Sequence, residues 1–131
     1  MRTLIVEDDF TNRLVLQQLL KSYGPCHIAV DGQEAVEAVG LSLKTNEPYD
    51  LICLDIMMPK LDGHEALKHI RALEEAKGIW STYGAKVVMT TALGGMKNVN
   101  AAFGNLCDAY LVKPIDASKL FEILRQLSLI Q

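Results

Sequence analysis

Short, continuously apolar runs alternate along the whole chain with segments whose apolar residues recur at helical spacing. The apolar runs are the predicted strands, and they cover residues 4–6, 26–30, 51–54, 87–90 and 109–112. The segments between and after them predict five amphipathic helices. A strand with one wet face would alternate polar and apolar residues, whereas a strand buried on both faces is apolar throughout. The pattern therefore predicts a parallel sheet that helices cover on both faces.

Few topologies fit five such units, because the crossover between two parallel strands is almost always right-handed. The commonest order is the flavodoxin-like 2-1-3-4-5, so we predict a doubly wound α/β fold with a five-stranded parallel sheet and five helices. In that fold a ligand site lies beyond the carboxyl ends of strands 1 and 3. Thr11 is a candidate N-cap of the first helix and Asp116 of the last, and a weaker helix is expected over residues 97–103.

Composition narrows the class of protein. The chain has 131 residues, of which 50% are apolar and 22% charged, with a formal net charge of -3, and these values are typical of one soluble domain. The 13 basic and 16 acidic residues form no block of like charge, which argues against a nucleic-acid-binding surface. No apolar stretch is long enough to span a bilayer, and we expect no signal peptide, because MRTLIVEDD reaches acidic residues after only three consecutive apolar ones.

These features lead to expectations about organisation and location. We expect residues 1–131 to form a single domain without an output domain, with no direct nucleic-acid contact and no membrane insertion. Cys26, Cys53 and Cys107 are odd in number and far apart, so they are interpreted as core thiols in a reducing compartment. A cytoplasmic location follows from this interpretation.

Polar residues stand where four of the predicted strands end. They are Glu7 and Asp8 after the first strand, Asp55 after the third, Thr91 after the fourth and Lys113 after the fifth. Three carboxylates held together away from water repel one another unless a cation compensates. Oxygen ligands favour Mg²⁺, with Mn²⁺ as a substitute, over zinc. With an ammonium and a hydroxyl beside them, such acids can stabilise a transferring phosphoryl group, and Asp55 is the candidate nucleophile.

Together these motifs resemble the receiver domain of two-component response regulators, including regulators of the chemotaxis kind. The matching segments are IVEDD, LDIMMPKLDG, TTA and YLVKP. They occur in the family's order and cover nearly the whole chain, which implies a single receiver domain. Each motif is common by itself, but all four at these separations are improbable by chance.

The resemblance implies a phosphoacceptor in two-component signal transduction. Asp55 would take a phosphoryl group from the phosphohistidine of a sensor histidine kinase or a phosphotransfer protein. Asp8 would bind Mg²⁺ directly and Glu7 mainly through water, while Asp55 and the backbone carbonyl of Met57 would complete the metal site. Asp9 lies one place beyond the acid pair and is expected to help cap the first helix.

The same resemblance implies a switch. Thr91 and Lys113 would contact the phosphoryl group, and a shift of Thr91 would rearrange the loop over residues 92–96, so that Tyr110 turns inward. The changed surface would bind a downstream target protein or support a phosphorylation-dependent homodimer. A domain of this kind is not an enzyme in the usual sense, because it catalyses only its own phosphorylation and dephosphorylation.

Several alternatives stay open at this point. Thr90 is the alternative to Thr91, and Tyr110 can be ordinary packing. A magnesium-dependent phosphohydrolase also forms an aspartyl phosphate, but it usually has a second acid two residues beyond the nucleophile, where this chain has Met57. A flavin-binding module on the same fold would need a loop rich in Ser, Thr and Gly where residues 7–9 are acidic.

Two further positions bear on how long a phosphoryl group persists. Family members with polar groups two places after the phosphorylated Asp and two places after the Thr can orient an attacking water. Here Met57 and Leu93 occupy those places, so a long-lived phosphoryl group is expected.

Trp80 can be either an anchor of its loop or an exposed contact.

Overall fold

A computed structural model describes residues 1–58, 60–79, 83–92 and 106–131 of the chain. The strands in these residues are β1 (Thr3–Val6), β2 (Cys26–Ala29), β3 (Leu51–Asp55), β4 (Lys86–Thr91) and β5 (Ala109–Val112). The α-helices are α1 (Phe10–Leu20), α2 (Gly32–Lys44), α3 (Gly63–Ala76) and α5 (Ala117–Gln126). A short 3-10 helix, Lys21–Tyr23, continues α1.

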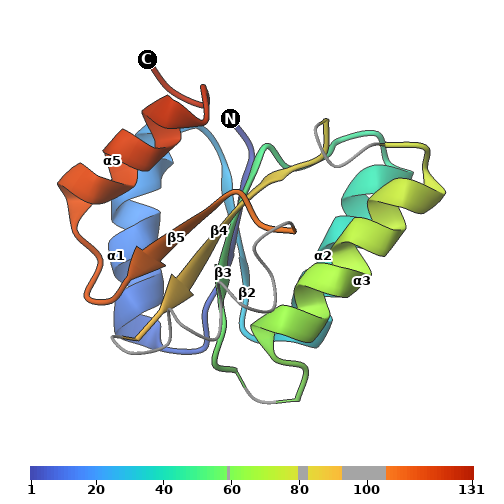
Figure 1. The fold of residues 1–131 in the computed structure, drawn as a ribbon, viewed down its shortest axis with the longest axis horizontal. Coiled ribbons are helices and arrows are strands. Elements are labelled where there is room, and N and C mark those ends of the chain that lie inside the picture. The colour runs from blue at the N-terminus through green and yellow to red at the C-terminus, as the bar shows by residue number, and fades with distance from the viewer. Residues whose placement is uncertain (59, 80–82, 93–105) are drawn as a thin grey trace.

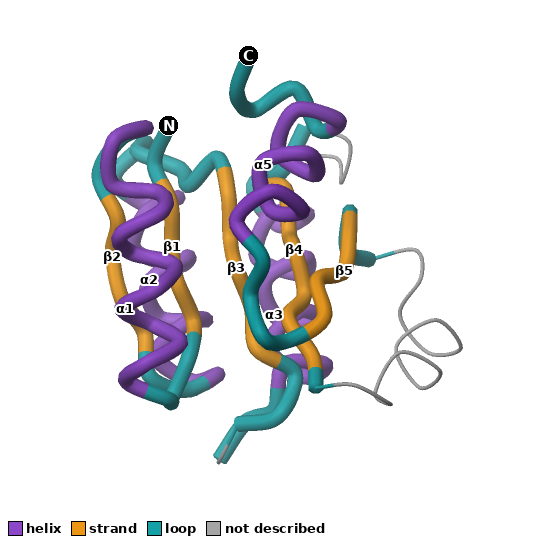
Figure 2. Tube along the Cα trace, turned by 90° about the vertical axis from the view of Figure 1, so that its left-hand side faces the viewer, coloured by secondary structure: helices purple, strands orange, loops and turns teal. Residues whose placement is uncertain are grey.

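The five strands form one parallel sheet in the order β2-β1-β3-β4-β5. Figure 2 shows the strands side by side in this order, with their carboxyl ends toward the bottom of the view. The predicted fold class and strand order are therefore confirmed. The helix predicted over residues 97–103 lies outside the described residues, as do Trp80, Leu93 and residues 93–96 of the expected switch loop.

Helices cover both faces of the sheet, with α1 and α5 on one face and α2 and α3 on the other (Figure 1). Successive residues of a strand point to opposite faces, so each strand supplies both cores. In β1, for example, Leu4 and Val6 pack in the core under α2 and α3. Ile5 packs in the core under α1 and α5, and all three side chains are almost completely buried. This two-sided burial explains the continuous apolar runs of the central strands, whereas the edge strand β2 has exposed His27 and Ile28.

Each of the four described helices begins at an aspartate whose carboxylate accepts a hydrogen bond from a backbone N–H of the first turn, and these N-caps are Asp9, Asp31, Asp62 and Asp116. The expected caps Asp9 and Asp116 are confirmed. Thr11 as a cap of the first helix is wrong, because Asp9 Oδ2 accepts from the amide of Asn12 at 2.9 Å and α1 already includes Thr11. A carboxylate at this position also interacts favourably with the helix dipole.

The three cysteines are free thiols, but only Cys53 is fully buried, whereas Cys26 and Cys107 are partly exposed. Burial raises the pKa of Cys53 to about 12. Cys53 therefore stays a protonated thiol at pH 8. We expect an alkylating reagent at pH 8 to modify Cys26 before Cys53, and to reach Cys53 only when the protein is unfolded. Peptide mapping that finds Cys53 alkylated first would contradict this.

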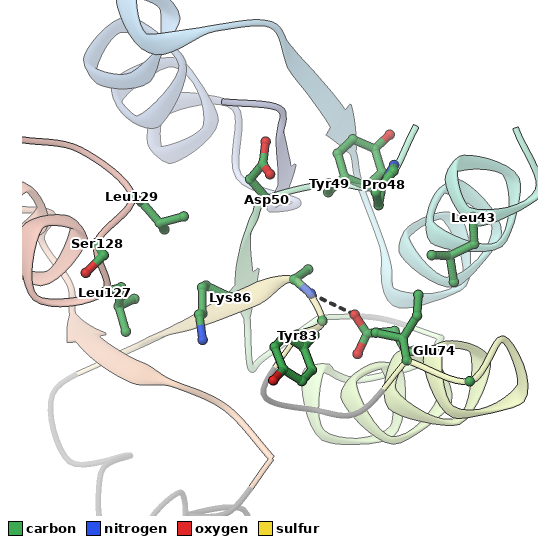
Figure 3. A pocket seen from close by; sticks show the side chains of 14 residues that line it. Leu43, Pro48, Tyr49, Asp50, Glu74, Tyr83, Lys86, Leu127, Ser128 and Leu129 are labelled. Carbon is green, nitrogen blue, oxygen red and sulfur yellow. Dashed lines mark hydrogen bonds between the residues drawn. The ribbon is translucent and has the colours of Figure 1, made fainter. Parts of the chain in front are cut away.

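A cavity of about 500 Å³ opens at the amino ends of the strands (Figure 3). Asp50, which directly precedes β3, and Lys86, which begins β4, are among its lining residues. None of the predicted site residues at the carboxyl ends of the strands lines this cavity.

Among the described residues, no helix has the length and apolar character needed to cross a membrane.

Candidate metal and phosphoryl site

The predicted site residues meet at the carboxyl edge of the sheet. Glu7 and Asp8 directly follow β1, Asp55 is the last residue of β3, and Lys113 directly follows β5. The parallel register aligns Val6 of β1 with Leu54 of β3, so the residues after these positions emerge side by side. The strand order that the sequence predicts is the reason these distant residues are neighbours.

Three carboxylates form a compact cluster here. Glu7, Asp8 and Asp55 each offer one oxygen, and these oxygens all lie within 4.8 Å of one another. Glu7 is only 1% exposed and Asp55 3% exposed, while Asp8 is open to solvent. The donor set fits Mg²⁺, which takes oxygen ligands, uses one or two carboxylates and keeps several waters. The open side at Asp8 leaves room for those waters or for a phosphoryl oxygen.

Lys113 bridges two of the acids. Its Nζ lies 2.8 Å from Oε1 of Glu7 and 3.2 Å from Oδ2 of Asp55. Burial and the neighbouring Asp55 raise the pKa of Glu7, while the Lys113 ammonium opposes part of that rise. Burial lowers the pKa of Lys113, but its contacts with Glu7 and Asp55 outweigh this effect and leave the pKa raised. The site thus holds a permanent positive charge beside the candidate nucleophile.

The alternation of side chains places these groups on one face of the sheet. Ile5, Cys53 and Leu111 belong to the core under α1 and α5. Glu7, Asp55 and Lys113 each follow one of these residues two places later, so they point toward the same face. The ion pairs of Lys113 are the direct result.

Thr91 and Tyr110 belong to the other face. Met89 is part of the core under α2 and α3, and Tyr110 packs against that core. Thr91 follows Met89 two places later on the same face, whereas Thr90 follows Val88, which packs under α1 and α5. Thr91 is therefore the threonine that shares a face with Tyr110, and its carbonyl accepts a hydrogen bond from the amide of Lys113 at 2.7 Å.

The loop after β3 is held close to the sheet. The amide of Met57 donates to Oδ1 of Asp55 at 3.2 Å, and the amide of Gly63 donates to the carbonyl of Ile56 at 2.9 Å. A Cβ at Gly63 would overlap the backbone oxygen of Asp55, so only glycine allows this close approach. The Met57 side chain is 74% exposed, and the metal-ligand role of its carbonyl stays a prediction.

Arg13 is a site residue that the sequence reasoning missed. Its Nη1 donates to the backbone carbonyls of Glu7 at 3.2 Å and Asp8 at 3.3 Å. The guanidinium also lies over the Phe10 ring, 5.6 Å from its centroid. These contacts tie the first turn of α1 to the loop that carries the acids. The only sequence signal for this role was the position of the arginine, one turn into the helix that comes after the acidic pair.

The response regulator receiver domain family has a model that matches residues 3–125 of this chain. The chain belongs to this family. The sensory/regulatory protein RpfC of Xanthomonas campestris pv. campestris is 34% identical over 128 residues, which are 98% of this chain but 16% of that protein. This chain thus spans about a sixth of the length of that relative. The two-component response regulator ORR41 of Oryza sativa subsp. japonica is 31% identical over 128 residues, 98% of this chain and 94% of that protein.

A solved receiver-domain structure agrees with the fold. The receiver domain of the sensor histidine kinase PA1611 from Pseudomonas aeruginosa superposes with a TM-score of 0.74 at 26% identity, covering 97% of each chain. That structure has a magnesium ion coordinated in its active site cleft. Receiver domains are the phosphoacceptors of two-component signalling, so family membership favours this interpretation over the flavin-binding and phosphohydrolase alternatives.

The contrast between exposed Asp8 and buried, lysine-paired Glu7 predicts unequal effects on metal binding. Asp8→Asn should weaken Mg²⁺ binding by about tenfold or more, equivalent to about 1.4 kcal/mol, because a direct charged ligand is lost. Glu7→Gln should weaken it less. Asp9→Asn is the matched control, since asparagine caps a helix as well as aspartate does. Calorimetric titration that gives wild-type affinity for Asp8→Asn would place the metal elsewhere.

Proposed function

We propose that Asp55 is the phosphoacceptor of this receiver domain and takes its phosphoryl group from a phosphohistidine on a sensor histidine kinase or a phosphotransfer protein. The observation that carries this proposal is the position of Lys113 Nζ, 3.2 Å from Oδ2 of Asp55 and 2.8 Å from Oε1 of Glu7. A buried carboxylate with both a cation partner and a cluster of metal-type ligands is equipped for attack on phosphorus.

In the transfer, one Asp55 carboxylate oxygen attacks the phosphorus atom and the P–N bond to the donor imidazole breaks. The imidazole leaves with the electron pair of that bond and takes up a proton. The Lys113 ammonium stabilises the negative charge on the phosphoryl oxygens, and the Thr91 hydroxyl donates to one of them once the aspartyl phosphate has formed. The location of Asp55, Thr91 and Lys113 at or just after strand ends supports these roles.

Glu7, Asp8, Asp55 and the backbone carbonyl of Met57 are the residues that would hold Mg²⁺, with Mn²⁺ as a substitute. A divalent ion bound there supplies positive charge against the phosphoryl oxygens. The burial of Glu7 and Asp55 supports this assignment, because three carboxylates in a partly dry cluster carry more negative charge than Lys113 alone offsets.

We further propose that Thr91 and Tyr110 transmit the phosphorylation state to an interaction surface. Both lie toward the face that α2 and α3 cover, so movement of one changes the packing available to the other. The partners are a kinase or phosphotransfer protein upstream and a target protein or a second copy downstream. The domain acts as a switch that turns over no separate substrate. The proposal includes a cytoplasmic location, which the three free thiols support.

The exposed Met57 side chain predicts a slowly decaying phosphoryl group. A thioether accepts hydrogen bonds only weakly, so it orients no attacking water beside Asp55. Met57→Asn should accelerate loss of the phosphoryl group by about tenfold, since one positioned hydrogen bond is worth about 1 kcal/mol or somewhat more. Decay of the isolated phosphorylated protein, followed by intact mass, measures this. The same decay rate in Met57→Asn and wild type would refute it.

Incubation with a small-molecule phosphodonor, with Mg²⁺ or with a chelator, tests the proposed function. We expect intact mass to show one phosphoryl group per chain with Mg²⁺ and almost none with chelator. Continuous release of inorganic phosphate from many phosphomonoesters, without modified protein, would instead indicate a phosphohydrolase.

A further inference from the structure

β5 is an edge strand with little buried side-chain surface. It has four residues, lies at the sheet edge and pairs only with β4. Leu111 is its single fully buried residue. Apolar patterning specifies strand register strongly only where one face is well buried, and a slip of one residue turns every side chain to the opposite face. Some other interaction must set where Lys113, which directly follows β5, emerges.

Asp108, just before β5, supplies such an interaction. Its amide donates to the carbonyl of Val87 at 2.8 Å, and its Oδ2 accepts from the amide of Val87 at 2.8 Å. One residue thus satisfies both backbone groups of one residue of β4. This reciprocal pair fixes the two strands at a single register from their amino ends, because a shifted strand would leave the Val87 amide without its carboxylate acceptor.

Arg71 of α3 holds Asp108 and the surrounding backbone in place. Its Nη2 lies 3.2 Å from Oδ2 of Asp108, and its Nε donates to the carbonyl of Leu106 at 2.9 Å. Its Nη1 donates to the carbonyl of Ala85 at 2.9 Å and to Oε1 of Glu74 at 2.8 Å. The other oxygen of Glu74, Oε2, accepts from the amide of Ala85 at 2.8 Å, and Figure 3 shows Glu74 with a dashed hydrogen bond. The Arg71 guanidinium therefore links the backbone segments that directly precede β4 and β5.

We propose that Asp108, held by Arg71, locks the register of β5 and is thereby a positioning residue for Lys113. The inference rests on the proposed function only in the role it gives to Lys113. Lys113 follows Asp108 by the length of one short strand, and a strand transmits a shift at one end to the other. The ion pairs of Lys113 with Glu7 and Asp55 exist only in the register that Asp108 sets.

Hydrogen exchange tests the lock without reference to phosphorylation. In Asp108→Ala, the amides of residues 109–113 should exchange about tenfold faster or more, including the Lys113 amide that donates to Thr91, while β1 and β3 keep their protection. Asp108→Asn retains one acceptor for the Val87 amide and should show a smaller change. Wild-type protection of residues 109–113 in Asp108→Ala would overturn the register lock.

A double-mutant cycle tests the link to Lys113. Asp108→Ala should slow uptake from a small phosphodonor by about tenfold in the wild-type background, and by less than about twofold in a Lys113→Ala background. Equal slowing in both backgrounds would overturn the positioning role. Val39→Ala, a core truncation in α2, is the control for lowered stability and should act equally in both backgrounds. If Lys113→Ala itself leaves uptake unchanged, the proposed role of Lys113 fails, and hydrogen exchange still decides the lock.

Discussion

Asp55→Asn should abolish phosphoryl uptake and leave the fold intact. The amide has nearly the shape of the carboxylate, and its oxygen can still accept the hydrogen bond that the Met57 amide donates. It is, however, neutral and a poor nucleophile, so no acyl phosphate forms. Lys113 loses its ion pair with Asp55 but keeps the one with Glu7, and removing one of three clustered negative charges relieves repulsion, so the melting temperature should change little. Intact mass after incubation with phosphodonor and Mg²⁺ measures uptake.

Asp50→Asn is the matched control for this substitution. Asp50 precedes the same strand at its opposite end, where its Oδ2 accepts from the amide of Arg2 at 2.7 Å, and an asparagine oxygen can replace that acceptor. We expect wild-type uptake in Asp50→Asn. Acid-labile phosphate on Asp55→Asn at the wild-type level would remove Asp55 from the mechanism.

Arg71→Met should destabilise the protein far more than the removal of an exposed charge does. The side chains of Arg71 and Glu74 are 9% and 4% exposed, and methionine keeps much of the volume while deleting every hydrogen bond of the guanidinium. Removing one partner of a buried pair strands the other charge, and costs about 3–5 kcal/mol. Urea unfolding measures the loss as a lower midpoint at an unchanged slope.

The same helix contains the control. Lys68 and Glu65 form an ion pair at the same three-residue spacing, but their side chains are 55% and 51% exposed. Lys68→Met should cost less than about 1 kcal/mol, because exposed pairs are screened by water. Adding Glu74→Gln to Arg71→Met should recover part of the loss, since it removes the stranded charge. Similar costs for Arg71→Met and Lys68→Met would contradict the assignment of Arg71 to a buried network.

The sequence predicted the strands well because burial on both faces makes the central strands continuously apolar. The third predicted strand, over residues 51–54 and ending at Asp55, matches the observed β3, which ends at Asp55. Strand order then placed Glu7, Asp8, Asp55 and Lys113 together, because the carboxyl ends of parallel strands share one edge. These successes depend on local patterns and on a topology rule.

Interactions between residues far apart in sequence escaped the prediction. Arg71 reaches Leu106 and Asp108 across 35 and 37 positions, and no periodicity marks such a contact. Arg13 was missed for a related reason. Its side chain donates to the backbone carbonyls of Glu7 and Asp8, and because every residue has a carbonyl, no sequence pattern marks these partners. The choice of Asp9 over Thr11 as the cap depends on where the chain turns into α1 after β1, which propensity alone does not specify.

Reductive trapping of the modified residue tests the central claim most directly. Borohydride reduces an aspartyl phosphate to homoserine, because the acyl phosphate is far more electrophilic than a free carboxylate. After incubation with phosphodonor and Mg²⁺, borohydride treatment and digestion, tandem mass spectrometry should locate homoserine at position 55 and leave Asp8, Asp9 and Asp62 unchanged. Homoserine at one of those other aspartates, with Asp55 intact, would contradict the account.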